Sequence, residues 1–398
     1  MITPVTSGWS NWSGRQRSRP IWLAEPTSEA DFIRAVELAT TDDLKIRAVG
    51  AAHSHSRVAA TDGILVTTDA WQGLISVDLD ARQATFRSGT RIHQAGPWLF
   101  PHGLALANQG DIDQQSLAGA VATGTHGTGP DLGNLSSSVA AIRLVLASGE
   151  AVTTSPIVEP ELFEVARLSL GGAGLVTELT FGLRDTYRLH ERLWSEHPDD
   201  VLARIDDLVG ATRHFEFFWL PGRDRCAVKT LTETKEATLD PRADRRRERI
   251  GWSHEIISSV RDEKHTEMEY AVPAENGPAC FVELRQLILT EFPDLAWPLE
   301  YRTVASDDLW ISPATHRPTV TISAHQDIAL DDRPLFDACE DIFRRHQGRP
   351  HWGKVHNLAG RDLNELYPRY RDWWNVRNRV DHDGRFLTPE LAALQPAT

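Results

Sequence analysis

Apolar residues recur at helical spacing in two segments of the chain, and a third segment is helix-like. An S-x-x-D helix start at Ser28 precedes residues 32–39, whose apolar positions fall on one helical face. Residues 335–343 repeat this spacing, and Cys339 lies on their apolar face, where we expect a buried, unreactive thiol. Residues 370–379 have a helix-like composition. We therefore predict a helix in each segment.

Short apolar runs between turn residues predict strands elsewhere. The runs expected to form strands are residues 45–50, 64–68, 74–79, 84–89, 214–220, 298–305 and 319–326. Residues 139–153 have the pattern of a hairpin, and residues 170–183 that of a glycine turn followed by a strand. The composition changes near residue 186, where a turn-rich part gives way to strongly aromatic segments. This mixture indicates an α+β protein with more than one domain.

Composition and charge exclude several classes of protein. The 398 residues include 42 Lys and Arg against 56 Asp and Glu, a formal net charge of −14, which disfavours nucleic-acid binding. The three cysteines lie far apart without a C-x-x-C pair, so we expect no metal site and no disulfide framework. The N-terminus lacks the apolar core of a signal peptide, and no run of about 20 apolar residues could span a bilayer. We therefore expect a cytoplasmic enzyme without a membrane span.

One basic run stands out from this acidic background. Residues 235–249 are highly charged and include three consecutive arginines at 245–247. We interpret the run as a solvated loop or helix face. A patch for an anionic partner is the weaker alternative.

Two loops of small residues carry the clearest chemical signal. Residues 47–54 and 116–129 consist mainly of Gly, Ala, Ser and Thr, and each contains a histidine. Small side chains let backbone N–H groups approach and bind a pyrophosphate closely. Each loop alone fits a tight turn equally well, but the pair favours a large phosphorylated cofactor. The motifs of Rossmann dehydrogenases, P-loop NTPases, zinc proteases and α/β-hydrolases are absent from the sequence.

Several short motifs follow one another in the order and spacing of a known family. They are N-W-S-G at residues 11–14, V-G-A-A-H-S at 49–54, the stretch 108–129, G-L-V-T at 174–177, E-Y-R at 300–302, H-W-G-K at 351–354 and D-H-D-G-R-F at 381–386. In these motifs the chain resembles FAD flavoproteins of the vanillyl-alcohol-oxidase type. It is most similar to their aldonolactone oxidases, such as gulono- and arabinono-lactone oxidase, and to their alditol oxidases. The family has a proline where His382 occurs here.

The resemblance implies an architecture. It implies an α+β fold with two domains. One is an FAD-binding domain of the PCMH type, and the other is a substrate cap domain built on an antiparallel sheet. Residues 1–185 would form the FAD-binding domain and residues 186–355 the cap. Residues 356–398 would return to the FAD-binding domain. The substrate would then lie between the cap and the flavin ring.

The resemblance also implies FAD as the cofactor. The residues expected to bind it are Arg47, Val49, Gly50, Ala51, Ala52, His53, Ser54, Gly110, Asp111, Ser116, Gly119, Thr123, Gly124, Thr125, His126 and Val176. His53 occupies the position where the family attaches the flavin covalently through its 8α-methyl group, and His55 is the rival for that bond. Contact without a bond stays an alternative, because some relatives bind their flavin non-covalently.

Four residues are candidates for catalysis. Glu300 and Arg302 lie two residues apart on a predicted strand, so both face one side of it. A surface ion pair is one interpretation; the resemblance implies that Arg302 donates to a substrate hydroxyl or lactone carbonyl and that Glu300 orients Arg302. Lys354 would be a second cation that stabilises a developing alkoxide, with an exposed lysine as the alternative. His325 is either a general base or a core histidine.

Three positions bear on the substrate and the oxidant. Asp111 occurs where alditol oxidases have a serine that contacts the polyol, which favours a lactone or an unusual substrate. Ser323 shares a strand face with His325, in a pattern closer to the aldonolactone members. We expect Asp111 and Ser323 to contact the substrate. Gly110 occurs where some relatives have an alanine beside the flavin, and a small residue there tends to permit reaction with dioxygen.

The function implied is hydride transfer from a carbinol C–H of a sugar-derived lactone or polyol to flavin N5. Dioxygen would reoxidise the flavin and yield hydrogen peroxide. The partners expected are thus a small-molecule alcohol and dioxygen, with no prediction of oligomeric state. The alternative is an oxidase or dehydrogenase on this scaffold that acts on a non-sugar alcohol or amine in secondary metabolism. Arg302 and Lys354 argue against a non-catalytic flavin carrier, and the net charge of −14 argues against a polyanion-binding module.

Overall fold

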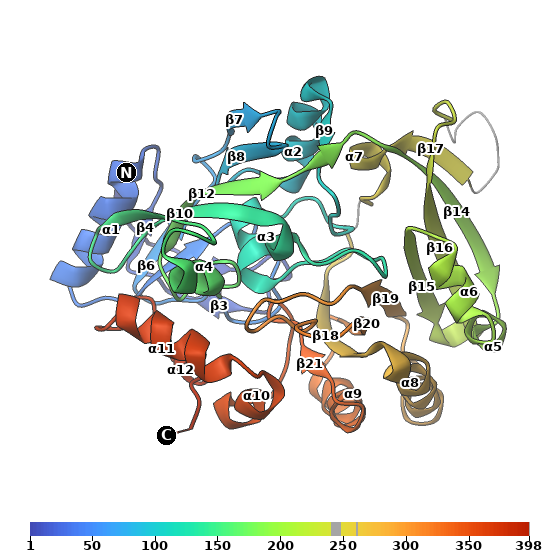
Figure 1. The fold of residues 1–398 in the computed structure, drawn as a ribbon. Helices are drawn as coiled ribbons and strands as arrows, with labels where there is room; N and C mark the ends of the chain where they lie inside the picture. The colour runs from blue at the N-terminus through green and yellow to red at the C-terminus, as the bar shows by residue number, and fades with distance from the viewer. Residues whose placement is uncertain (240–247, 260–261, 398) are drawn as a thin grey trace.

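A computed structural model describes residues 1–239, 248–259 and 262–397 of the chain. The arginines at 245–247 lie outside the described residues. Within the described part, two smaller sheets belong to the N-terminal half and one large antiparallel sheet to the remainder (Figure 1). No described helix combines the length and apolar character needed to cross a membrane.

A small, partly parallel sheet opens the chain. Its strands, in spatial order, are β1 (Ile2–Pro4), β4 (Trp22–Ala24), β6 (Ile64–Thr67) and β5 (Ile46–Val49). Because β4 and β5 both run parallel to β6, a crossover is needed, and helix α1 (Glu29–Thr41) provides it. The predicted helix is confirmed, with Phe32 and Val36 buried and the Asp31 carboxylate accepting the Ser28 N–H at 2.9 Å.

A second, antiparallel sheet completes the N-terminal half. Its strands, in spatial order, are β11 (Ala151–Thr154), β10 (Val139–Val145), β12 (Leu175–Gly182), β8 (Gln83–Arg87) and β7 (Leu74–Asp78). β10 and β11 form the hairpin predicted from the sequence. Two short pairs lie beside the sheets: β2 (Trp9–Ser10) with β3 (Arg17–Ser18), and β9 (Leu104–Ala105) with β13 (Arg184–Asp185). The helical segments are α2 (Ile92–Leu99), η1 (Phe100–His102), α3 (Leu117–Thr123), η2 (Leu135–Ser138) and α4 (Pro160–Ala166).

The third sheet has eight strands, each antiparallel to its neighbours. In spatial order they are β17 (Glu248–Trp252), β14 (Arg188–Glu196), β16 (Arg225–Thr234), β15 (His214–Leu220), β19 (Leu299–Val304), β20 (Thr319–Asp327), β18 (His265–Pro273) and β21 (Arg349–Pro350). The predicted strands at 214–220, 298–305 and 319–326 lie next to one another at its centre. Its helical segments are α5 (Pro198–Leu202), α6 (Ile205–Gly210), η3 (Pro221–Arg223), α7 (Ser253–Ile256), η4 (Ala274–Asn276), α8 (Gly277–Glu291) and α9 (Arg333–Arg345).

One face of the large sheet is apolar and is covered by α8 and α9 (Figure 1). Tyr301 stacks on Phe217 with ring centroids 4.7 Å apart, and Phe281 of α8 packs edge-on against both rings. The predicted buried thiol is confirmed: Cys339 on α9 is fully buried, and burial raises its pKa to about 12. The opposite face is polar and carries the candidate site.

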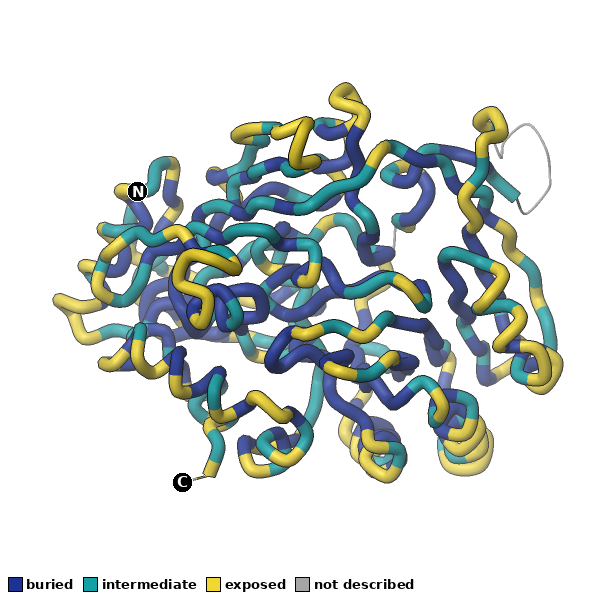
Figure 2. Tube along the Cα trace, viewed as in Figure 1, coloured by how far each residue is buried: buried dark blue, intermediate teal, exposed yellow. Residues whose placement is uncertain are grey.

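The C-terminal helices return to the N-terminal half. They are α10 (Gly360–Leu366), α11 (Tyr370–Val380) and α12 (Pro389–Ala392), and α11 packs against α4 (Figure 1). The Asp381 carboxylate accepts backbone N–H groups from Arg385 at 2.6 Å and Phe386 at 2.9 Å. This turn buries the Phe386 ring completely in the core beneath α1. Figure 2 shows the buried trace running through the sheets, with exposed residues on the outer sides of the helices.

Candidate active site

The two small-residue loops predicted from the sequence meet each other. A Cβ atom on Gly50 would fall 1.9 Å from Ser116 Oγ, so only glycine fits at this crossing. The Ser116 hydroxyl in turn accepts the Gly119 N–H at 3.2 Å and caps helix α3. Ala52 adopts a left-handed conformation with φ of 57°. The first loop therefore turns sharply beside the start of α3.

Both loops line one pocket. Of the predicted cofactor residues, those in its lining are Arg47, Val49, Gly50, Ala51, Ala52, His53, Ser54, Ser116, Gly119, Thr123 and Val176. The remaining predicted residues, Gly110, Asp111, Gly124, Thr125 and His126, lie outside this lining. Asp111 and His126 instead contact the large sheet, as described below.

Arg47 organises the walls of the pocket. Its guanidinium donates to the carbonyl groups of Val58, Leu170, Gly171 (2.8 Å) and Phe386 (3.2 Å). Burial lowers its pKa to about 10, and the nearby Arg377 adds to this effect. The side chain thereby joins both pocket walls to the C-terminal segment, in addition to lining the pocket.

His53 of the first loop and His55, which follows it, face different surroundings. His53 lines the pocket, and its pKa is lowered to about 4, first by burial and then by Lys354 and Arg91. His55 is only 4% exposed, and its Nε2 lies 3.5 Å from Glu267 Oε2 on the large sheet. The pocket is therefore next to His53, whereas the His55 ring faces the sheet.

Cross-strand register gathers the predicted catalytic residues on one polar face. Glu300 lies opposite Ser323, and Arg302 lies opposite Thr321 on one side and Glu216 on the other. Glu300 and Arg302 are 3% and 8% exposed, so the interpretation of a surface ion pair is wrong. The hydroxyl groups of Thr321 and Ser323 have no hydrogen-bond partner among the described residues.

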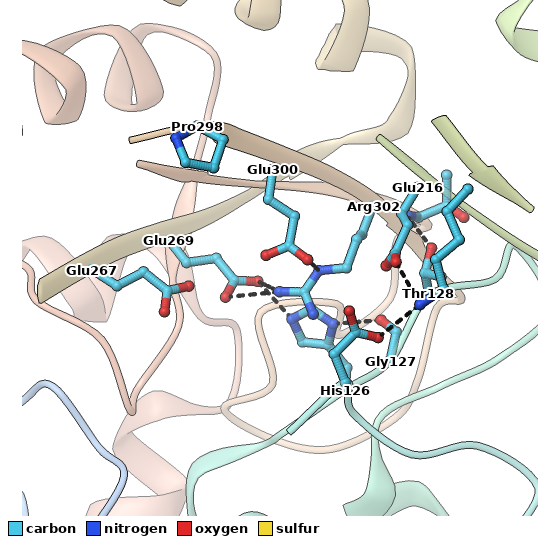
Figure 3. Close-up of polar contacts among 12 residues, drawn as sticks. His126, Gly127, Thr128, Glu216, Glu267, Glu269, Pro298, Glu300 and Arg302 are labelled. Carbon is cyan, nitrogen blue, oxygen red and sulfur yellow. Dashed lines mark hydrogen bonds and ion pairs between the residues drawn. The ribbon is translucent and has the colours of Figure 1, made fainter. Parts of the chain in front are cut away.

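Glu269 on β18 joins Arg302 to the second loop (Figure 3). Its carboxylate lies 3.3 Å from Arg302 Nη2 and 2.7 Å from His126 Nε2. Burial alone would raise the pKa of Glu269, but Arg302 and His126 lower it well below its usual range. The Nδ1 atom of His126 faces the Gly127 carbonyl at 2.8 Å. The second loop therefore lies directly against the polar face of the sheet.

Glu267 is the centre of a second cluster. Lys354 donates to its carboxylate, so the interpretation of Lys354 as an exposed lysine is wrong. Burial alone would raise the pKa of Glu267, but Lys354 and the neighbouring imidazoles lower it well below its usual range. His325 has its Nε2 3.7 Å from Glu267 Oε1, and its Nδ1 donates to the Pro298 carbonyl at 2.8 Å. Burial lowers the pKa of His325 to about 4, so its imidazole is neutral at pH 7.

Asp111 belongs to a third cluster, at the other end of the face. Lys229 Nζ lies 2.9 Å from Glu216 Oε1 and 3.5 Å from Asp111 Oδ1. Burial, followed by the charge of Asp111, raises the pKa of Glu216 to about 7. The Asp111 backbone carbonyl also accepts the Ser259 N–H at 2.9 Å. Lys229 thus joins the segment just before the second loop to the sheet.

Histidines and carboxylates come close enough in places to resemble metal ligands. His126, Glu269 and His351 have potential ligand atoms within 4.8 Å of one another. The same holds for His55, His265 and Glu267. However, Arg302 and Lys354 already neutralise the two carboxylates, so a metal ion would have to displace one of these cations.

Glu216, Lys229, Glu267 and Glu269 are not among the residues predicted from the sequence. Glu267 and Glu269 lie two residues apart in H-T-E-M-E-Y, so the available signal was the alternation of polar and apolar positions along β18. Glu216 lies among aromatic residues on β15, and Lys229 lies in the middle of β16. Their importance comes from direct cross-strand pairing, which one sequence does not display.

Comparison with protein families gives two matches. The model of the D-arabinono-1,4-lactone oxidase family matches residues 179–251 and 241–394. The model of an FAD binding domain matches residues 20–155. Together the matches cover most of the chain. The FAD binding domain match includes both small-residue loops, and the lactone oxidase match includes the strands of the large sheet.

Individual proteins extend these matches. The chain is 32% identical to L-gulono-1,4-lactone dehydrogenase of Mycobacterium tuberculosis, over 95% of this chain and 97% of that protein. It is 26% identical to L-gulonolactone oxidase of Mus musculus (96% and 97% covered) and 30% identical to alditol oxidase of a Streptomyces species (86% and 89% covered). Its fold is similar to that of cholesterol oxidase from B. sterolicum, with a TM-score of 0.87, 16% identity, and 99% and 98% of the chains covered. The predicted α+β fold with an FAD-binding domain is thus confirmed.

Proposed function

We propose, because this chain belongs to the D-arabinono-1,4-lactone oxidase family, that it is an FAD-dependent oxidoreductase that oxidises a CH–OH group of a sugar-derived lactone or polyol. One observation supports this most strongly. The second loop, with His126, and the segment before it, with Asp111, lie against a buried sheet face that carries Arg302 and Glu267, and Lys354 donates to Glu267. A substrate between flavin and sheet would meet both cations.

The pocket between the two loops suits FAD. Its lining is mostly Gly, Ala, Ser and Val, which lets backbone N–H groups reach a pyrophosphate. Arg91 Nη1, beside Gly50, is buried without a hydrogen-bond partner among the described residues, so it is available to a phosphate oxygen. FAD, when bound, supplies the acceptor for a hydride and the route for its two electrons to dioxygen.

The chain's own residues would hold and polarise the substrate. We assign Arg302 to the reacting oxygen, with Glu300 and Glu269 fixing the guanidinium from two sides at 3.6 Å and 3.3 Å. The Ser323 hydroxyl, which has no hydrogen-bond partner among the described residues, would bind a further substrate hydroxyl. Lys354 would stabilise negative charge on oxygen as the C–H bond breaks.

His325 is our candidate for holding the hydroxyl proton. Its Nδ1 donates to the Pro298 carbonyl, so its Nε2 carries the lone pair that can accept a proton. The imidazolium that forms would be stabilised by Glu267, 3.7 Å away. This arrangement compensates for the low pKa of about 4 that burial gives the free imidazole.

We also propose that His53 carries the flavin covalently and that dioxygen reoxidises it to give hydrogen peroxide. Its position in the pocket lining supports His53 over its rival His55. The domain division at 185 and 355, and a cytoplasmic location, are kept as predictions. The second candidate substrate is a non-sugar alcohol or amine, such as an amino alcohol, because Asp111 occurs where alditol oxidases have a serine that contacts the polyol.

The test is reduction of the purified protein's flavin under anaerobic conditions. L-gulono-1,4-lactone, D-arabinono-1,4-lactone, xylitol and an amino alcohol would each be added, and flavin bleaching recorded. Bleaching by a lactone or polyol, followed by hydrogen peroxide on admitting air, is the expected result. Bleaching by the amino alcohol alone would favour the second candidate. A protein that binds no FAD would contradict the proposal.

A further inference from the structure

The turn at residues 11–16 holds the loop that carries His53. Three side-chain or backbone groups of the turn donate to carbonyl groups of the loop: Trp12 N–H to Ala52 (2.8 Å), Asn11 Nδ2 to Ser54 (2.9 Å) and Gln16 Nε2 to His55 (2.8 Å). Asn11 is 5% exposed, and its own Oδ1 accepts the Gln16 N–H at 3.0 Å. A hydrogen bond within the turn therefore fixes the shape of the turn that contacts the loop.

Trp12 also contacts the His53 side chain itself. The two rings stack with centroids 5.2 Å apart and planes 28° apart. Trp12 also packs edge-on against His265 of the large sheet, with ring centroids 5.5 Å apart. Stacking uses the face of an imidazole and leaves its nitrogen atoms free at the edge. Within the described residues, no hydrogen bond engages either ring nitrogen of His53.

The backbone next to His53 needs this support. Ala52 has a φ of 57°, a conformation that costs a non-glycine residue about 1 kcal/mol. The bond from Trp12 N–H to the Ala52 carbonyl holds that conformation. Burial, Lys354 and Arg91 keep the imidazole neutral at pH 7, as a nucleophile requires.

We infer that Trp12 is a positioning residue for covalent attachment of the flavin, with its indole fixing the plane of His53 so that a ring nitrogen faces the flavin methyl group. This inference rests on the covalent link proposed above. Trp12 does not take part in substrate oxidation in this assignment. Its role is to orient the imidazole before the bond forms.

The step balances without any group beyond FAD and dioxygen. A bond forms between an imidazole nitrogen of His53 and the 8α-carbon of the flavin, while one C–H bond of the methyl group and the imidazole N–H bond break. The methyl carbon gives up two electrons, which reduce the flavin ring, and the two protons released end on that reduced ring. Dioxygen then takes two electrons and two protons, which restores the oxidised flavin and yields hydrogen peroxide.

The test compares flavin attachment in four full-length proteins: wild type, Trp12→Leu, Trp12→Phe and Trp22→Leu. Trp22 on β4 is a matched control, since it packs into the same N-terminal half against the core beneath α1. Each protein is supplied with FAD in air, samples are precipitated with acid over time, and flavin in pellet and supernatant is measured. Bound FAD before precipitation and the melting temperature are recorded in parallel.

We expect Trp12→Leu to bind FAD but attach it about tenfold more slowly than wild type, so that most flavin enters the supernatant. Trp12→Phe, which keeps a stacking ring, should stay within about threefold of wild type, and Trp22→Leu should attach FAD normally. If Trp12→Leu does not fold, Asn11→Ala, which removes one of the loop's supports, should show the same slowing.

Two results would overturn the inference. Attachment at the wild-type rate in Trp12→Leu would show that stacking is unimportant, and loss of all FAD binding in that variant would assign Trp12 to cofactor binding instead. A wild-type protein whose flavin is entirely released by acid would contradict the covalent link itself, and the inference with it. In that case the substrate-dependent bleaching described above still decides the proposed oxidoreductase activity separately.

Discussion

Buried carboxylates in the candidate site differ in charge because their neighbours differ. Glu216, Glu267 and Glu269 are all at most 3% exposed. Lys354 and Arg302 lower the pKa values of Glu267 and Glu269, whereas burial and then the charge of Asp111 raise that of Glu216 to about 7. Two of these residues therefore hold fixed negative charge, and the third can take up or release a proton near neutrality.

Lys354 is expected to matter for the rate of substrate oxidation. Lys354→Met removes the cation beside Glu267 and should slow flavin reduction by about 100-fold, because negative charge on the substrate oxygen loses its partner. Lys354→Arg keeps the charge and should lose less than about tenfold. Anaerobic stopped-flow measurement of flavin reduction checks both variants. Equal rates for wild type and Lys354→Met would remove Lys354 from the catalytic set.

Glu216 predicts a specific pH dependence of stability. Its pKa is raised from 4.5 to about 7, so the folded state favours the protonated form; this stabilisation is present below about pH 4.5 and is lost as pH rises through about 7. Between pH 5 and pH 8 the wild type should therefore lose about 2 to 3 kcal/mol of unfolding free energy that Glu216→Gln does not lose. Urea denaturation at the two pH values measures the difference. Glu37→Gln, at an exposed position on α1, should show none.

At the scale of elements, alternation along strands separates scaffold from chemistry. On β19, Tyr301 packs beneath α8 while Glu300 and Arg302 on either side of it face the second loop. The same alternation places Met268 in the core between Glu267 and Glu269 on β18. Adjacent strands thus bring several charged groups together on one face of the sheet.

The crossing of the first loop and helix α3 can be tested with a compensating pair. Gly50→Ala would bring a methyl group 1.9 Å from Ser116 Oγ and 2.7 Å from its Cβ, so the two elements must separate. We expect FAD affinity to fall about tenfold or more, since both elements line the pocket. Fluorescence titration in a His53→Ala background, which removes the site of the proposed covalent link, measures the change.

Replacing Ser116 supplies the control for that prediction. Adding Ser116→Gly to Gly50→Ala removes both clashing atoms and should restore part of the affinity, even though Ser116→Gly alone loses the hydroxyl that caps α3. If the double variant binds FAD no better than Gly50→Ala, the crossing does not control the pocket.

At the scale of the whole molecule, the C-terminal segment around Phe386 packs against strand β5 and helix α1 of the N-terminal half. The Ile46 N–H donates to the Arg385 carbonyl at 2.9 Å, Arg47 donates to the Phe386 carbonyl, and Phe386 fills the core beneath α1. Arg47 also lines the cofactor pocket. The C-terminal return and the pocket are therefore parts of one packed unit.

Phe386→Ala tests this dependence. Deleting a fully buried phenylalanine should lower the free energy of unfolding by about 3 to 4 kcal/mol and release the C-terminal segment from the pocket walls. Urea denaturation followed by tryptophan fluorescence measures the loss, and flavin fluorescence reports the pocket. His382→Ala, at an exposed position in the same turn, should leave both signals unchanged. Loss of stability with an unaltered flavin environment would show that the segment and the pocket are independent.

Local patterns were enough to predict most elements and the cofactor loops. The helix stripe at Phe32 and Val36, the strand carrying Glu300 and Arg302, and the small-residue loops all depend on residues close together in sequence. The polar alternation of H-T-E-M-E-Y was visible as well, but nothing in one strand reveals which residues lie opposite it. Glu267 and Glu269 gain their importance only from His126, Lys354 and Arg302, which come from other parts of the chain.

By itself, the sequence determined the fold class, the family and the loops suited to FAD, because periodicity, glycine positions and motif order are properties of neighbouring residues. The tertiary structure alone decided which charges meet. Strand register set Arg302 between Glu216 and Thr321, and long-range packing set Trp12 on His53 and Lys229 on Asp111. Burial then fixed the protonation states, since the free energy of a charge in a protein interior depends on partners that can be hundreds of residues away in the sequence.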